Sequence, residues 1–171
     1  DERGLRTDVL ARVLRARRVK LVYATPAVQS PTGVVLDDAR REELLALADE
    51  HQTPVLEDDY DSELRITGPP TAALKTRDAM QQVLYVGTFS KAILPGLRIG
   101  YLVAPPHLLA RLAWMRFAGD FGSGVIPQAA LAEMLAAGDL ERHVRRVRKV
   151  YATRLDALDA ALGEAMPGDA R

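Results

Sequence analysis

The densest group of chemically active side chains is an acidic string at residues 57–63 (EDDYDSE), which carries five carboxylates. An acidic run of this kind can be a solvated loop, or a magnesium site, since hard cations bind clustered carboxylates. It can also hold a single buried aspartate that pairs with a protonated heterocyclic nitrogen, with Tyr60 donating a hydrogen bond beside it. The string alone does not decide among these three possibilities.

Lys91 is the residue that favours the third possibility. Only four of the 23 basic residues are lysines, so a lysine in a chain that otherwise uses arginine indicates chemistry rather than charge. A neutral lysine amine can attack an aldehyde and form a Schiff base, which arginine cannot do, provided that desolvation or a nearby cation disfavours the ammonium form. Arg98 is a candidate phosphate clamp because a guanidinium binds phosphate through two parallel hydrogen bonds, and Thr88 can add a hydroxyl. The alternative for Lys91 is an exposed loop lysine.

Composition excludes several other classes of protein. Lys+Arg and Asp+Glu total 23 each, and this balance argues against a chain built mainly to coat nucleic acid or an anionic membrane. No apolar run approaches the ~20 residues of a membrane helix, and the charged start DERGLRTDVL is not a signal peptide, so we expect a soluble, cytoplasmic domain. Cysteine is absent and the three histidines are scattered, which excludes disulfides and zinc–thiolate sites and leaves no metal-ligand spacing.

Apolar strands alternate with amphipathic helices along the chain. Strands are predicted at residues 19–23, 54–56, 83–86 and 99–103. Helices are predicted at residues 5–17, from Asp37 or Asp38 to about 52, and at 108–117, 127–137 and 140–162, with a connector at 118–124. In the last helix, five residues at helical spacing are expected to face inward: Val144, Val147, Tyr151, Leu155 and Leu158.

This alternation predicts an α/β fold with a mostly parallel sheet that has helices on both faces. Ligands of such sheets bind at the carboxyl ends of the strands. Three polar motifs lie after the carboxyl ends of predicted strands, at residues 29–33 (QSPTG), 57–63 and 88–91 (TFSK). We therefore expect the three motifs to meet at one edge of the sheet.

The chain resembles the fold-type-I, pyridoxal-phosphate-dependent aminotransferases of class I/II. Within this family it is most similar to the aminotransferase-like domain of MocR-type transcription regulators, which belong to the GntR family. The resemblance covers essentially the whole chain and rests on SPTGVVL (30–36), EDDYDSELR (57–65), YVGTFSKAILPGLRIGYLVAPP (85–106) and GDLERHVRRVRKVYATR (138–154). It implies that residues 1–171 are the C-terminal part of the large domain, with the fourth strand antiparallel. The upstream half, the small domain and any winged-helix domain have no counterpart here, so a fragment is expected.

The resemblance also implies a cofactor, pyridoxal 5′-phosphate, and roles for particular residues. Lys91 would form the Schiff base and, once a substrate amine displaces it, shuttle the substrate proton. Asp58 would keep the pyridine nitrogen protonated, which makes the ring an electron sink, and Tyr60 would hydrogen-bond the ring 3-oxygen. Asp59 and Asp61 are expected to orient the loop rather than to contact the cofactor.

The cofactor phosphate would be bound by Thr88 and Arg98, with Ser90 as a further candidate. The loop before PTG departs from the family, because aminotransferases often carry Asn where Ser30 stands. Gln29 is the candidate to replace that ring contact, and the alternative is that Gln29 only packs the loop.

Two functions share this chemistry. The complete protein would transaminate an amino acid with a keto acid, as a homodimer. Alternatively it would sense an amino acid or amine without turnover, as part of a MocR-type regulator that binds DNA through a domain absent from this chain. A third, unrelated hypothesis is a magnesium-dependent phosphotransfer domain that uses Asp58, Asp59 and Asp61; it leaves Lys91 and Arg98 unexplained. The basic residues of the last helix are expected to form a solvated face rather than a nucleic-acid site.

Overall fold

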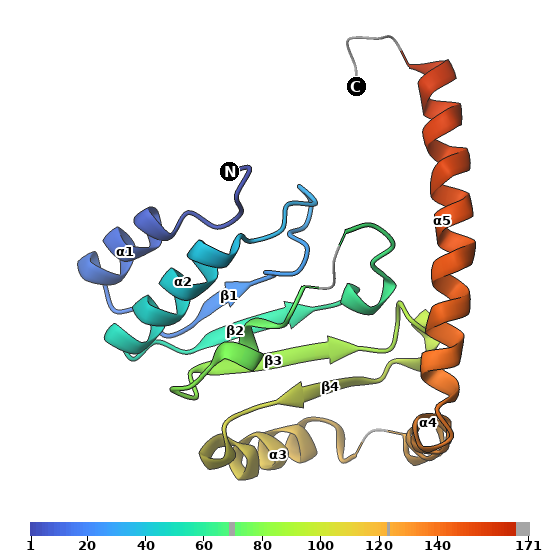
Figure 1. The fold of residues 1–171 in the computed structure, drawn as a ribbon. Helices are drawn as coiled ribbons and strands as arrows, with labels where there is room; N and C mark the ends of the chain where they lie inside the picture. The colour runs from blue at the N-terminus through green and yellow to red at the C-terminus, as the bar shows by residue number, and fades with distance from the viewer. Residues whose placement is uncertain (69–70, 123, 167–171) are drawn as a thin grey trace.

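A four-stranded sheet lies at the centre of the computed structural model, which describes residues 1–68, 71–122 and 124–166 (Figure 1). The strands β1 (Val22–Ala24), β2 (Val55–Asp59), β3 (Val83–Thr88) and β4 (Gly100–Val103) lie in this order across the sheet. The first three strands are parallel, and β4 is antiparallel to β3. The mostly parallel sheet with an antiparallel fourth strand is therefore confirmed.

Helices α1 (Thr7–Ala16) and α2 (Asp38–Glu50) precede β1 and β2, and three helices follow β4: α3 (Pro106–Asp120), α4 (Val125–Ala136) and α5 (Asp139–Ala165). In Figure 1, α5 stands beside the ends toward which β1, β2 and β3 point, and its far half extends beyond the sheet. Three short 3₁₀ helices lie in the connections: η1 (Ser62–Leu64), η2 (Leu74–Arg77) and η3 (Pro95–Leu97). Among the described residues, no helix is long and apolar enough to cross a membrane.

The core lies between α2 and the sheet. Asp37 caps α2 by accepting a hydrogen bond from the Arg40 amide at 2.8 Å, which satisfies one of the free N–H groups of the first turn. The helix then packs Leu44 against Val55 and Val83, all three with no exposed surface. Side chains alternate along each strand, so only every second residue of β1, β2 and β3 faces this core.

A buried arginine joins α2 to the loops around it. Arg41 is 1% exposed, and its guanidinium donates hydrogen bonds to the carbonyls of Pro26, Leu36 and Ala72 at 2.7, 2.8 and 2.9 Å. The carbonyls of Pro26 and Leu36 belong to the loop that follows β1. Arg41 therefore fixes this loop against the helix, as buried charge requires several hydrogen-bond partners.

Several element boundaries differ from the prediction. β2 continues through Glu57, Asp58 and Asp59, because the carboxylates of Glu57 and Asp59 find hydrogen-bond donors on the core side. β3 continues to Thr88, where it pairs with Gly100 of β4. α3 continues to Asp120, which shortens the expected connector at 118–124; Ser123 of that connector lies outside the described residues.

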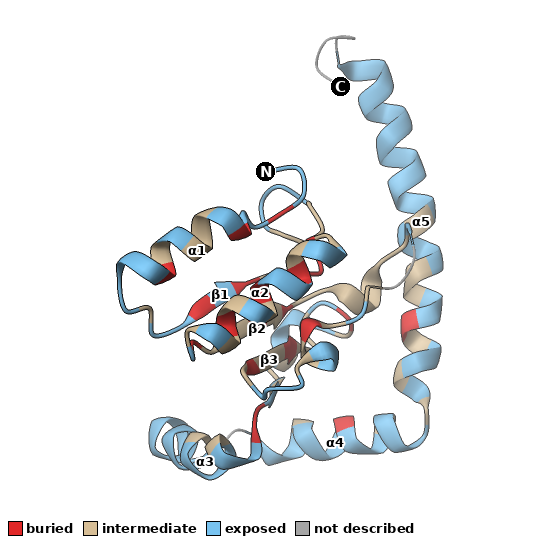
Figure 2. Ribbon diagram, turned by 60° about the vertical axis from the view of Figure 1, so that its left-hand side comes forward, coloured by how far each residue is buried: buried red, intermediate tan, exposed pale blue. Residues whose placement is uncertain are grey.

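The prediction for the inward face of α5 was wrong over most of its length. Val144 is buried and Val147 half-buried, whereas Tyr151, Leu155 and Leu158 are 36%, 42% and 54% exposed. Figure 2 shows the same change along the helix, with the far half entirely exposed. Helical spacing identified an apolar stripe, but only the first half of α5 has described elements packed against it.

Gly87 gives a test of the packing between β3 and β4. An added Cβ there would overlap the ring of Tyr101, whereas at Gly119 in α3 nothing lies within 4 Å of the added atom. We expect Gly87→Ala to lower the free energy of unfolding by about 1–3 kcal/mol through overpacking. The same substitution at Gly119 should leave stability unchanged or raise it by up to about 1 kcal/mol, since alanine favours the helix. Urea unfolding followed by circular dichroism measures both changes, and equal effects at the two positions would contradict the packing described.

Candidate functional site

The three polar motifs meet at the carboxyl edge of the sheet, as predicted. β1, β2 and β3 are parallel, so the loop after β1, the end of β2 and the turn after β3 open on the same side of the molecule. The strand register pairs Asp58 with Val86, and Thr88 lies two residues further along the same face of β3. This edge therefore collects Asp58, Thr88 and the segment that leads to Lys91.

Asp58 lies on the face of the sheet opposite α2, where it is half-buried. One oxygen of its carboxylate, Oδ2, accepts a hydrogen bond from the hydroxyl of Tyr23 on β1 at 2.7 Å. This bond is the largest cause of the raised pKa of Tyr23, with burial second. Sequence analysis missed Tyr23; the signal was a single tyrosine between two apolar residues of a short strand.

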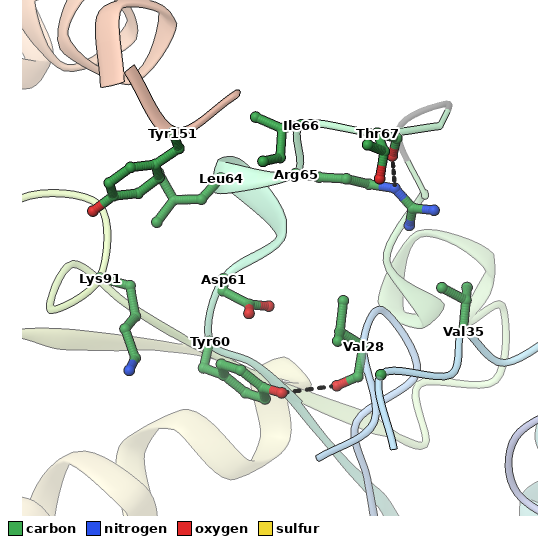
Figure 3. Close-up of a pocket in the computed structure, with 11 residues that line it drawn as sticks. Val28, Val35, Tyr60, Asp61, Leu64, Arg65, Ile66, Thr67, Lys91 and Tyr151 are labelled. Carbon is green, nitrogen blue, oxygen red and sulfur yellow. Dashed lines mark hydrogen bonds between the residues drawn. The ribbon is translucent and has the colours of Figure 1, made fainter. Parts of the chain in front are cut away.

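A cavity of about 480 Å³ opens at the same edge, and Lys91 lines it together with Tyr60 and Asp61 (Figure 3). The Lys91 amine makes no hydrogen bond or ion pair with any residue that the structure describes. Burial, and then the nearby Asp59, raise the pKa of Asp61, while the positive charge of Lys91 acts in the opposite direction. The cavity thus holds a solvent-exposed primary amine close to a carboxylate.

Tyr60 connects this cavity to the loop after β1. Its hydroxyl donates a hydrogen bond to the carbonyl of Val28 at 3.1 Å, as Figure 3 shows. Burial, followed by the charges of Asp61 and Asp58, raises the pKa of Tyr60, so its phenol stays protonated and able to donate. The ring of Tyr60 is therefore held between the ends of β1 and β2.

Thr88 and Ser90 form a small hydroxyl cluster after β3. The Thr88 hydroxyl lies 3.0 Å from the Ser90 hydroxyl and accepts a hydrogen bond from the Ser90 amide at 3.1 Å. It also lies 3.4 Å from the carbonyl of Ile99, which is the chain neighbour of Arg98. Arg98 itself has a left-handed backbone (φ 51°) and an exposed side chain that forms no ion pair within the described residues.

Gln29 is engaged within its own loop. Its side-chain amide donates to the carbonyl of Ser30 at 2.7 Å, and its side-chain oxygen accepts from the Thr32 hydroxyl and from the Thr32 amide. The backbone N–H of Gln29 donates to Val34 at 2.9 Å. These bonds fit the loop-packing alternative, and a contact from Gln29 to a cofactor stays a prediction.

The acidic string is split between the two faces of the sheet. Glu57 points to the core side, where its carboxylate accepts from the amides of Leu74 and Lys75 at 2.6 and 2.8 Å. Asp59 also lies on that side and accepts from Ser62 and from the hydroxyl of Tyr85, whereas Asp58 faces the other way. In the part of the chain that the structure describes, no group of three or more metal-ligating side chains is placed to hold a cation.

Helix α5 contacts both loops that border the cavity, which sequence analysis did not predict. The ring of His143 forms a hydrogen bond of 2.9 Å between Nε2 and the carbonyl of Ala92, next to Lys91. Arg148 donates from Nε to the carbonyl of Glu63 at 2.6 Å, and Tyr151 lines the cavity itself. Polar residues in an amphipathic helix gave no signal that two of them, His143 and Arg148, would hydrogen-bond to loops from elsewhere in the chain.

Fold and site together define an α/β domain with a free lysine amine and a separately held aspartate at the carboxyl edge of a parallel sheet. The family model for aminotransferase class I and II matches residues 1–170. The chain belongs to this family.

Relatives of two kinds are similar to this chain. Aromatic-amino-acid aminotransferase 1 of Thermococcus litoralis is 34% identical over 98% of this chain and 41% of its own length. The probable rhizopine catabolism regulatory protein MocR of Rhizobium meliloti is 38% identical over 79% of this chain and 27% of its own length. Aminotransferases and MocR-type regulators are therefore related to the chain at similar levels of identity.

A solved structure confirms the fold. The kynurenine aminotransferase of Pyrococcus horikoshii, crystallised in complex with PMP, superposes with a TM-score of 0.90 at 36% identity, over 98% of this chain and 43% of its own. The chain thus spans less than half the length of each of these relatives, and its fold corresponds to that part of a larger aminotransferase structure.

The hydrogen bond between Tyr60 and Val28 gives a local prediction. Tyr60→Phe leaves the Val28 carbonyl without this donor, so the free energy of unfolding should fall by about 1 kcal/mol. The increase in mobility should be confined to the loop after β1. We expect faster hydrogen exchange at the amides of Gln29 and Gly33, whose hydrogen bonds close the turn in this loop. Tyr151→Phe is the matched control, since Tyr151 lines the same cavity. Unchanged exchange in Tyr60→Phe would show that the loop does not depend on this bond.

Proposed function

We propose that this chain is the lysine-bearing part of a pyridoxal-phosphate-dependent aminotransferase domain that, in the full-length protein, transaminates an amino acid. The observation that carries the proposal is the Lys91 amine, which lies unpaired among the described residues in a cavity at the carboxyl edge of the sheet. Lys75, by comparison, is held in an ion pair with Asp78 at 2.7 Å. Membership of the aminotransferase family supports the same conclusion.

The residues present fit the chemistry of this cofactor. Asp58 has one carboxylate oxygen bound to Tyr23 and the other without a donor among the described residues, as an aspartate that pairs with a protonated ring nitrogen requires. The hydroxyls of Thr88 and Ser90 lie 3.0 Å apart near the backbone of Arg98, and hydroxyls with a guanidinium are suitable donors to a phosphate. Pyridoxal phosphate supplies a ring that accepts the electrons released at a substrate α-carbon.

Within this scheme each side chain has a separate task. Lys91 would hold the cofactor through its aldehyde and would move a proton to and from the substrate carbon. Asp58 would keep the ring nitrogen protonated, and Tyr60 could donate its hydroxyl proton to the ring oxygen only by leaving the Val28 carbonyl. Thr88, Ser90 and Arg98 would bind the phosphate, and Gln29 would hold the loop beside the ring.

The covalent bond to Lys91 is the first test. The full-length protein is titrated with pyridoxal phosphate, reduced with borohydride and mapped by peptide mass spectrometry. We expect the phosphopyridoxyl group on Lys91 and loss of this adduct in Lys91→Ala. Lys20→Ala is the matched control, because Lys20 is an exposed lysine on the connection before β1. An adduct on other lysines, or one that persists in Lys91→Ala, would refute the proposal.

The regulator is a second candidate because the probable MocR protein is as similar to this chain as the aminotransferase is. A sensing domain would use Lys91, Asp58 and the phosphate-binding residues in the same way but would not release product. Its amino-acid or amine ligand would change the state of a DNA-binding domain elsewhere in the protein.

Turnover separates the two candidates. Purified full-length protein, loaded with pyridoxal phosphate, is incubated with a set of amino acids and a keto-acid acceptor, and new keto acid is measured over time. We expect many product molecules per protein for the aminotransferase and at most one for the sensor. Lys91→Ala controls for non-enzymatic transamination. Single-turnover behaviour with every amino acid tested would overturn the enzyme and favour the sensor.

A further inference from the structure

Asp58 of β2 accepts a hydrogen bond from Tyr23, a residue to which the proposed function gives no role. We infer that Tyr23 is a positioning residue, whose hydroxyl fixes one oxygen of Asp58 so that the other is free to bind a protonated ring nitrogen. This inference rests on the proposed function, because it assigns the second oxygen of Asp58 to a pyridoxal-type ligand. It adds a residue on β1 that would influence how Asp58, on the neighbouring strand, binds the ring nitrogen.

The strand register brings Tyr23 and Asp58 together. Tyr23 is opposite Leu56 in the parallel pair of β1 and β2, so Asp58 is its diagonal neighbour, two residues further along on the same face. A long aromatic side chain spans such a diagonal, and the hydroxyl reaches Oδ2 at 2.7 Å. Tyr23 also borders a groove whose lining includes Gln29 and Tyr60 together with residues of α1.

Asp58 needs such a partner because its own torsion does not fix the carboxylate plane. The terminal torsion of an aspartate joins sp³ and sp² carbons and is broad, so the two oxygens exchange places easily. A phenol bound to one oxygen removes this freedom. The bond to Asp58 also raises the pKa of Tyr23, so the phenol stays a donor throughout the neutral pH range.

The neighbouring carboxylates show the contrast. Glu57 accepts from two backbone amides, and Asp59 accepts from Ser62 and Tyr85, so each has a donor on both of its oxygens. Asp58 accepts only from Tyr23 among the described residues. Of these three residues of β2, only Asp58 has a hydrogen-bond donor on just one of its two oxygens among the described residues.

The test compares Tyr23→Phe with wild type for two ligands in the full-length protein. One ligand is pyridoxal phosphate, and the other is its benzaldehyde analogue, in which C–H replaces the ring nitrogen while the aldehyde, hydroxyl and phosphate groups remain. Dissociation constants are measured by absorbance titration. We expect Tyr23→Phe to raise the dissociation constant of pyridoxal phosphate about tenfold, as for loss of a hydrogen bond to a charged group. The dissociation constant of the analogue should not change. A purely structural role would weaken both ligands equally.

Two control variants make the comparison specific. Tyr85→Phe removes the same kind of hydroxyl–carboxylate bond from Asp59 on the other face of β2, and should not discriminate between the ligands. In an Asp58→Asn background, Tyr23→Phe should have no further effect on pyridoxal phosphate. The ring of Tyr23 is 59% exposed, so Tyr23→Phe should keep the wild-type melting temperature, which thermal unfolding verifies.

The outcomes separate the inference from the proposed function. Wild-type protein that binds neither ligand contradicts the proposed function itself. Wild-type protein that binds pyridoxal phosphate, with equal or no effects of Tyr23→Phe on the two ligands, overturns only the role of Tyr23. An effect of Tyr23→Phe that persists at full size in the Asp58→Asn background also overturns that role, because the hydroxyl would then act on something other than Asp58.

Discussion

Three consecutive carboxyl groups at the end of β2 impose the main constraint on this structure, because three such groups in one strand each need a hydrogen-bond donor of their own. Strand alternation sends Glu57 and Asp59 to the core side and Asp58 to the other face. Glu57 orders η2 through the backbone amides of Leu74 and Lys75, and Asp59 holds Ser62 at the start of η1. The loops around the site are thus shaped by the carboxylates that do not face it, which leaves Asp58 available.

Arg41 completes this arrangement from the helix side. Burial raises the pKa of Glu57, the amides of Leu74 and Lys75 act in the opposite direction, and the guanidinium of Arg41 adds a smaller favourable charge. The same guanidinium binds the carbonyls of Pro26 and Leu36, at both ends of the loop that carries Gln29. The loop after β1 and the end of β2 are therefore held by two buried side chains, Arg41 and Glu57, neither of which lines the cavity.

The sequence was sufficient to predict a mostly parallel sheet and the meeting of three motifs at one edge, because strand periodicity and parallel connections determine which ends coincide. The antiparallel fourth strand was expected only from the family resemblance. It placed the end of β2 too early, since an acidic run is normally a loop and its donors come from distant residues such as Tyr85. It also missed the contacts of Tyr23 and His143, which depend on the strand register and on helix docking. Such contacts join residues 35 and 51 positions apart and leave no local pattern.

Because α5 is long and contacts the cavity loops through two hydrogen bonds, it can act as a lever on these loops. The helix has 27 residues, and among the described residues its hydrogen bonds to the cavity loops come from His143 and Arg148, in its first half. At 1.5 Å per residue, the part beyond Arg148 is a rigid arm about 25 Å long, so a tilt of about 5° at those contacts moves its tip by about 2 Å. The reverse also holds: a force on the exposed tip acts with leverage on the backbone beside Lys91 and Asp61. Within the described residues, α5 thus connects the loops beside Lys91 and Asp61 to a point about 25 Å away.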